Sequence, residues 1–457
     1  MARTDNNTPL WSSHFAFYLC AVGGAVGLGS IWRFPYLVGS SGGSAFIFVF
    51  LLACLLIAIP LLTAEFAIGR AARRSPPQAA GVVAQASGLS TRWNAIGVLG
   101  TLATFMIMSY YTVIAGWVLA YTWKVGVGAL AGLDRPEVAA LWRQFLARPW
   151  EVGAWHLTFI ALVTFISARG LGRGIEAANR IRAPALLALL LVLVAYALAT
   201  GDVKNGLAFA FAPNFGAISP KVVLAAIGQA FFATGVGMAM MLAYGCYVER
   251  GTSLLRCAII IVSSILLVSL LATLMIFPLV FAYGMDPAQG MELVFEVLPT
   301  LFAEMPGGRV IGTLFFLLLV FAALTPSLAG IEPLVAWLEQ GRGFSRTMAA
   351  TIACGASWLL GIGSVLSFSL WSGWRPLGGI PAFAQSTFFD VMDYASSNVL
   401  LPVGALLISV FVGWRASRAT IAEQLEETTP FGRRAVIWLL RYACPAALAI
   451  ILATAIV

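Results

Sequence analysis

The chain has 457 residues, of which 60% are hydrophobic and only 10% are charged. Charged residues supply about a quarter of an ordinary soluble chain, so this composition excludes a soluble enzyme and indicates a membrane protein. The 27 basic residues exceed the 19 acidic ones and give a net charge of +8, which in a membrane protein reflects basic cytoplasmic loops rather than nucleic-acid binding. Six cysteines without CxxC spacing and only two histidines predict neither a disulfide framework nor a metal cage.

Stretches of about 20 apolar residues, long enough to cross a roughly 30 Å hydrocarbon core as helix, recur along the chain. They predict an all-α membrane protein with about eleven transmembrane helices, over residues 11–39, 44–70, 94–126, 153–170, 184–200, 220–247, 255–284, 309–339, 346–371, 382–414 and 435–456. Most basic residues, Arg180 and Arg182 among them, fall in alternate loops on the side of the N-terminus. The positive-inside rule then places the N-terminus inside and, after eleven spans, the C-terminus outside.

The first and sixth predicted helices each contain a glycine-rich interruption at mid-length. Residues 23–29 carry four glycines, and residues 231–237 carry a second Gly-x-Gly. Since each glycine costs a helix roughly 1 kcal/mol relative to alanine, both segments predict a break. Unwound backbone is tolerated at membrane depth only where it lines a cavity or is held by protein. Paired interruptions in two halves of a chain are therefore typical of a midplane substrate site in a secondary transporter.

Close helix packing is the alternative explanation for the same glycines. Gly23 and Gly27 fit the small-xxx-small pattern of packed membrane helices. That pattern leaves out Gly24 and Gly29, which lie on other faces, and it does not account for Arg33 directly after them. A charge inside an apolar span is costly and indicates function, so we expect a carboxylate on another helix as the partner of Arg33.

These motifs resemble those of the sodium:neurotransmitter symporter family. The resemblance rests on GGAVGLGSIWRFPY, GGSAF and IPLLTAEFAIGR within residues 11–70, and it continues through residues 228–232, 276–278, 321–333 and 388–394. It implies the LeuT-type fold, in which two inverted repeats of five helices have helices 1 and 6 broken at mid-membrane. The repeats would span about residues 11–200 and 220–414, with an additional helix at about 435–456, in a single transporter domain over residues 1–457.

The resemblance implies a substrate pocket between the broken helices and a gate on each side of it. Main-chain amides of the first break and the helix N-terminus beyond it would bind a substrate carboxylate. Amine carriers of the family have aspartate at the position of Gly27, so this chain is similar to amino-acid carriers. The residues that match pocket positions are Ala25, Gly27, Leu28, Gly29, Ile107, Tyr111, Phe232, Gly235, Met238, Pro326 and Gly330. Those that match gates are Arg33 with Asp393 on the outside and Trp11 with Tyr247 on the inside.

The first sodium site of the family is predicted to be absent. Its side-chain positions correspond to Ser30, Ala233 and Ile265, of which only Ser30 has an oxygen. A hard cation needs several oxygen donors, so the loss of two leaves the ion poorly coordinated. Thr234 would restore a donor only if the break shifted by one residue.

The second sodium site is predicted to lose one oxygen donor and to keep the others. By resemblance these are the carbonyls of Gly23, Val26 and Ala322 and the hydroxyl of Thr325, which would hold one sodium ion. Pro326 stands at the position of the second hydroxyl, so that donor is lost unless Ser327 turns inward.

Together these features predict alternating-access uptake of a large hydrophobic or aromatic amino acid, or a related indole or amine, across the bacterial inner membrane. Pocket glycines leave room for a large substrate, and sodium coupling would be weakened or absent. Two alternatives stay open: a sodium-independent or proton-coupled carrier, and a non-transporting sensor that kept the pocket. Glu65, Glu332 and Asp390 are candidates for a buried proton, each otherwise a brace or a helix-end charge.

The remaining expectations concern chemistry and partners. No nucleophile, base and orienting group occur together in the motifs, so an enzyme is not expected. The expected partners are a small-molecule substrate and the lipid bilayer, without nucleic acid, and we expect no cofactor beyond one sodium ion. The chain would be a monomer or a weak dimer.

Overall fold

The computed structural model describes residues 10–285, 290 and 292–456, and every regular element in these residues is helical. Within these described residues nine helices are long and apolar enough to cross a membrane, and α1 (His14–Ala25) with η1 (Gly29–Arg33) and α2 (Phe34–Ser40) forms a bent tenth span. The short apolar helix α11 (Pro220–Thr234) and the following α12 (Met240–Cys246) correspond to the sixth predicted helix. The prediction of an all-α membrane protein with about eleven spans is confirmed.

The other spans follow the sequence-based ranges closely. In chain order they are α3 to α4 (Ser44–Ala72), η3 to α6 (Thr91–Gly126), α8 (Pro149–Ala168), η4 to α9 (Leu171–Thr200), α13 (Leu254–Ala282), α15 (Gly308–Arg342), α16 (Arg346–Ser367), α17 to η9 (Phe388–Arg415) and α20 to α21 (Pro430–Thr454). Shorter connecting helices are α5 (Pro76–Ala86), α7 (Arg135–Leu146), α10 (Val203–Phe211), α14 (Leu298–Glu304) and α19 (Arg418–Gln424).

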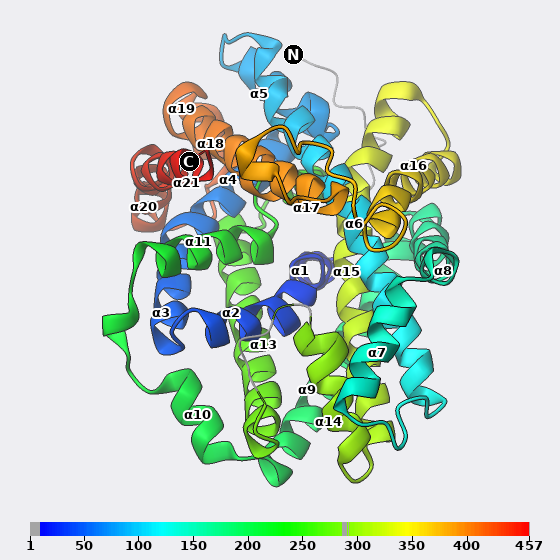
Figure 1. The fold of residues 1–457 in the computed structure, drawn as a ribbon. Helices are drawn as coiled ribbons and strands as arrows, with labels where there is room; N and C mark the ends of the chain where they lie inside the picture. Colours follow the sequence, from blue (N-terminus) through cyan, green and yellow to red (C-terminus); the bar gives the residue numbers. More distant parts are fainter. Residues whose placement is uncertain (1–9, 286–289, 291, 457) are drawn as a thin grey trace.

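The first span lies at the centre of the molecule. Figure 1 shows α1 and α2 enclosed by the later helices, and α1 packs against α9, α13 and α15. In its most apolar stretch 83% of α15 is buried, against 22% for α20 to α21. The broken first span is therefore held by protein rather than by lipid, while the last helices lie at the periphery.

Both predicted interruptions are present. The last α-helical hydrogen bond of α1 runs from the Val26 amide to the Val22 carbonyl, 2.8 Å away, and the axis bends by 54° before η1 begins. Residues 235–239 separate α11 from α12, with φ values of 67° at Gly235, 84° at Gly237 and 56° at Ala239. Glycine reaches this left-handed region without steric cost, which is why the second break falls on the Gly-x-Gly.

Candidate functional site

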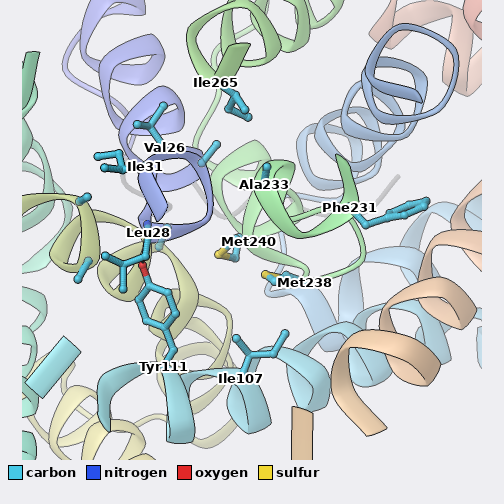
Figure 2. Close-up of a cluster of buried hydrophobic side chains, with 14 of the residues drawn as sticks. Val26, Leu28, Ile31, Ile107, Tyr111, Phe231, Ala233, Met238, Met240 and Ile265 are labelled. Atoms are coloured by element: carbon cyan, nitrogen blue, oxygen red, sulfur yellow. The ribbon is translucent and has the colours of Figure 1, made fainter. Parts of the chain in front are cut away.

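The two breaks face a small cavity in the middle of the molecule. Its volume is about 30 Å³, and its walls are Gly24, Ala25, Gly27, Gly29, Ile107, Met108, Tyr111, Phe232, Ala233, Gly235, Met238, Met240 and Pro326. Figure 2 shows Tyr111 reaching from α6 toward Leu28, with Met238 and Met240 below Ala233. The cavity volume of about 30 Å³ is far below the roughly 300–1,000 Å³ that is typical of ligand pockets. The walls must therefore move apart before a substrate as large as an amino acid can enter.

Most residues expected in the pocket lie on the wall of this cavity. The exceptions are Leu28, whose amide lies 3.5 Å from the Tyr111 hydroxyl behind the wall, and Gly330. A Cβ built on Gly330 would lie 2.6 Å from the Sδ atom of Met108, which itself lines the cavity. Gly330 therefore influences the pocket through Met108 rather than by direct exposure to it.

Methionines fill the space that the pocket glycines leave. A Cβ on Gly235 would collide with Cε of Met240, just as one on Gly330 would collide with Met108. Neither Met108 nor Met240 was expected from the sequence, because a methionine in an apolar helix carries no distinguishing pattern. Methionine is unbranched and adapts its shape readily. The closed volume is thus set by side chains that can move away when a substrate arrives.

Hydrogen bonds from neighbouring helices hold the unwound segments. The Glu65 carboxylate accepts a bond from the Gly237 amide at 2.7 Å, and the Thr104 hydroxyl donates to the Met238 carbonyl. On the first break, the Gln229 side chain donates to the Gly29 carbonyl at 2.8 Å. Glu65 is fully buried, so this geometry supports its role as a brace for the second break.

Arg33 and Asp393 are not joined by a direct ion pair within 4 Å in the described part of the chain. The Arg33 guanidinium instead lies 4.5 Å above the ring of Phe232, a cation–π contact over a wall of the cavity. Asp393 accepts hydrogen bonds from Tyr110 at 2.9 Å and Ser397 at 3.0 Å. The expected outer gate pair therefore has both of its members held by other groups in this state.

The opposite side of the cavity is closed by Trp11. Its indole N–H donates to the Tyr244 carbonyl and its amide to the Tyr247 carbonyl, both at 3.3 Å, and the side chain is 4% exposed. These bonds attach the segment before α1 directly to the end of α12. The expected inner gate residues Trp11 and Tyr247 are therefore in contact.

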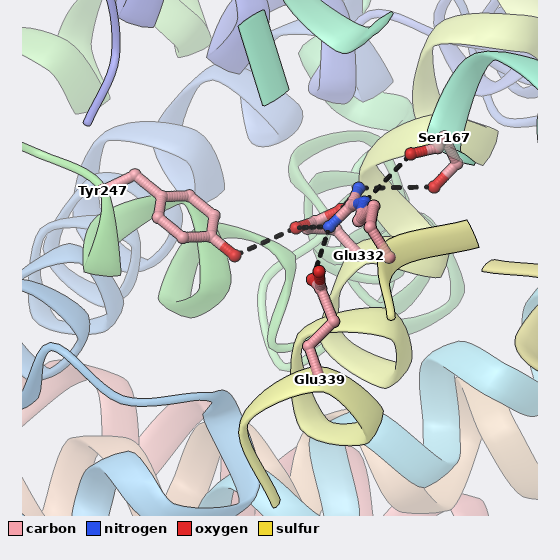
Figure 3. A network of polar contacts seen from close by, with 5 residues as sticks. Ser167, Tyr247, Glu332 and Glu339 are labelled. Atoms are coloured by element: carbon pink, nitrogen blue, oxygen red, sulfur yellow. Dashed lines mark hydrogen bonds and ion pairs between the residues drawn. The ribbon is translucent and has the colours of Figure 1, made fainter. Parts of the chain in front are cut away.

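A buried ion pair stabilises the same closed side (Figure 3). The Tyr247 hydroxyl donates to Glu332 at 2.9 Å, and Arg346 binds Glu332 at 2.6 Å and Glu339 at 3.0 Å. Arg346 also donates to the main-chain carbonyl of Ser167 at 2.9 Å. The Glu332 side chain is 1% exposed and is paired with a cation, which fits a structural carboxylate better than a proton carrier.

The residues at the first sodium position do not fit a sodium ion. Among the described residues the buried Ser30 hydroxyl has no hydrogen-bond partner, and Ala233 and Ile265 (Figure 2) bring no side-chain oxygen. The break does not shift to bring in Thr234, because its hydroxyl donates to the Ala230 carbonyl of its own helix at 2.6 Å. One hydroxyl cannot replace the set of oxygen donors that a hard cation requires.

The second sodium position is also changed by its surroundings. Ser327 does not turn inward, because its hydroxyl donates to the Ala323 carbonyl at 2.8 Å. Arg182 does not lie in a basic loop as the sequence suggested; it is 7% exposed within α9, and its Nη1 lies 3.5 Å from Oγ1 of Thr325. A guanidinium therefore contacts the one side-chain oxygen left at this site.

Known proteins resemble this chain over nearly its whole length. The model of the sodium:neurotransmitter symporter family matches residues 8–131 and 150–457. An uncharacterised sodium-dependent transporter from Bacillus subtilis is 35% identical, with 96% of each chain covered. A sodium-dependent neutral amino acid transporter from Rattus norvegicus is 27% identical over 60% of this chain and 41% of its own. The crystal structure of MhsT in complex with L-phenylalanine is 36% identical, covers 98% of this chain and 99% of that one, and superimposes with a TM-score of 0.89.

Proposed function

The chain belongs to the sodium:neurotransmitter symporter family, and we propose that it imports a large hydrophobic or aromatic amino acid by alternating access, with weakened or absent sodium coupling. Family membership makes it a multi-pass membrane transporter for a small molecule and not an enzyme. The matching solved structure shows that the fold is of the LeuT type. The substrate and the strength of coupling are the parts that we infer from the site.

The composition of the cavity wall carries this proposal. None of the described residues that line it is charged, so an amine would find no carboxylate among them, whereas the amides of the first break suit a carboxylate ligand. The side chain of a bound amino acid would then contact Phe232 and the three methionines. The related structure that contains L-phenylalanine supports a substrate of this class.

The difference between the two sides of the cavity supports alternating access. The side with Trp11 is closed by hydrogen bonds and by the Glu332–Arg346 pair, whereas Arg33 and Asp393 are not joined. The basic loops support an N-terminus, and with it Trp11, in the cytoplasm and a C-terminus outside. We infer a bacterial inner-membrane carrier, a monomer or weak dimer, whose two repeats of about residues 11–200 and 220–414 rock about the cavity.

Uptake into proteoliposomes tests the proposal. Radiolabelled L-phenylalanine, L-tryptophan, L-leucine and tryptamine are offered to the reconstituted protein, with sodium and proton gradients imposed separately. We expect concentrative uptake of the aromatic amino acids with little dependence on sodium. Binding without flux would establish the sensor, and the absence of binding by any of the four compounds would refute the assigned substrate class.

Two tyrosine-to-phenylalanine variants test whether the hydroxyl of Tyr111 contacts the substrate. Tyr111→Phe removes the group that faces the first break, and a lost hydrogen bond of about 0.5–1.5 kcal/mol should weaken amino-acid binding by roughly two- to tenfold. Tyr196→Phe removes a hydroxyl that bonds the Pro306 carbonyl far from the cavity and should change nothing. Equal effects of the two variants would show that Tyr111 does not contact the substrate.

Proton coupling is favoured as a second candidate by one observation. Oε2 of Glu65 is buried and has no partner in the described part of the chain, so this oxygen could carry a proton. Uptake driven by a pH gradient in wild type and lost in Glu65→Gln would support this candidate. Retention of proton-driven uptake in that variant would restrict Glu65 to bracing the second break.

A further inference from the structure

Arg182 contacts Thr325, a residue that the family resemblance assigns to the second sodium position. Its guanidinium donates to three neutral oxygens: Nε to the Ala178 carbonyl at 3.2 Å, Nη2 to Asn179 at 3.4 Å and Nη1 to Thr325 at 3.5 Å. In the described residues no carboxylate lies within 4 Å of it. A buried arginine without an acidic partner needs some other source of negative potential.

The C-terminal end of α1 is a source of such potential close to these partners. Beyond the Val26 amide the helix stops, so the carbonyl of Gly23 and those after it fall outside the regular hydrogen-bond pattern. The C-terminal end of a helix carries the negative end of its dipole and favours a cation. The last turn of α1 has no basic residue of its own.

Contacts around Gly23 bring the arginine and this helix end together. A Cβ on Gly23 would lie 2.6 Å from Cγ2 of Thr325 and 2.9 Å from Oδ1 of Asn179. These are the two side chains that the Arg182 guanidinium contacts. The end of α1, the middle of α15 and the start of α9 therefore meet at one buried point, and Arg182 supplies the positive charge there.

We propose that the guanidinium of Arg182 acts as a tethered cation at the second sodium position, so that this chain closes around its substrate without a sodium ion there. This deepens the proposed function by assigning its weakened coupling to one residue. A sodium ion beside a guanidinium that has no carboxylate partner among the described residues would be repelled in this weakly polar interior. The carbonyls at the end of α1 and the Thr325 hydroxyl remain in place. They would bind a sodium ion once the charge of Arg182 is removed.

Thermal unfolding of the purified full-length chain tests the proposal with sodium alone. The melting temperature is followed as sodium chloride replaces choline chloride at constant ionic strength. Wild type should show no sodium-specific increase, whereas Arg182→Gln, which keeps a polar side chain but removes the charge, should be stabilised by sodium. Arg182→Lys keeps a cation and should behave as wild type. Arg180→Gln, an exposed arginine of the same helix, is the matched control and should also remain insensitive.

Two outcomes would overturn the proposal. One is a sodium-specific increase in the wild-type melting temperature as large as that of Arg182→Gln, which would mean that sodium enters despite the arginine. The other is insensitivity of Arg182→Gln, which would mean that the missing hydroxyl and not the charge excludes sodium. Should Arg182→Gln fail to fold, Arg182→Met replaces it in both comparisons.

A second measurement connects the arginine to substrate binding. In Arg182→Gln the affinity for L-phenylalanine should rise about tenfold with sodium, a coupling of about 1.4 kcal/mol, and in wild type it should not change with sodium. A sodium effect of equal size in the two proteins would also overturn the proposal. Because the unfolding experiment contains no amino acid, a wrong substrate class would abolish this binding signal and leave the unfolding result intact.

Discussion

Replacing Gly330 with alanine tests how the size of the pocket is controlled. The new Cβ would lie 2.6 Å from Sδ and 2.8 Å from Cε of Met108, closer than side chains approach in practice. Met108 must therefore shift, and because it lines the cavity, whose volume is only about 30 Å³, we expect it to move into that space. The methionine then occupies space that a bound aromatic side chain needs.

The expected magnitude follows from the cost of overpacking. Inserting methyl groups into a well-packed site typically costs about 1–3 kcal/mol. Each 1.4 kcal/mol is a factor of ten, so affinity for L-tryptophan should fall by roughly ten- to a hundredfold. L-leucine leaves room for the displaced methionine and should lose less. Binding to purified protein is the appropriate assay, because transport would mix this effect with gating.

Two further variants make the result decisive. Met108→Ala combined with Gly330→Ala should recover most of the lost affinity, because the clash acts through Met108. Gly355→Ala, on α16 with nothing within 4 Å of the new Cβ, controls for the gain in helix propensity. Equal losses for tryptophan and leucine, or no recovery in the double variant, would refute the reasoning and remove the main argument for a large substrate.

Two other predictions concern ions and the closed side of the molecule. Introducing asparagine, threonine and asparagine at Ser30, Ala233 and Ile265 should create sodium dependence in L-phenylalanine binding, and wild-type flux that already requires two sodium ions per substrate would contradict this. Arg346→Gln should lower the melting temperature strongly, because it leaves a buried carboxylate uncompensated at a cost of about 3–5 kcal/mol. Adding Glu332→Gln to it should restore most of that stability, and equal melting temperatures of wild type and the single variant would show that the pair is not structural.

Local features of the sequence determined the helices and their breaks. Apolar runs fix where a chain can cross a bilayer, and clusters of glycine destabilise a helix wherever they occur, so both were readable without a structure. The loss of donors at the first sodium position was readable for a similar reason, since Ala233 and Ile265 have no side-chain oxygen in any conformation. These properties belong to single residues or to short segments.

Only the tertiary structure decided which groups share the site. Met108 fills the space beside Gly330, Arg346 pairs with Glu332, and Arg182 reaches Thr325 across 143 positions of sequence. Charge counting alone assigned Arg182 to a cytoplasmic loop, because it lies near other arginines in the chain. Its burial depends on the packing of α9 against α1 and α15, and such contacts between distant segments leave no periodic pattern in the sequence.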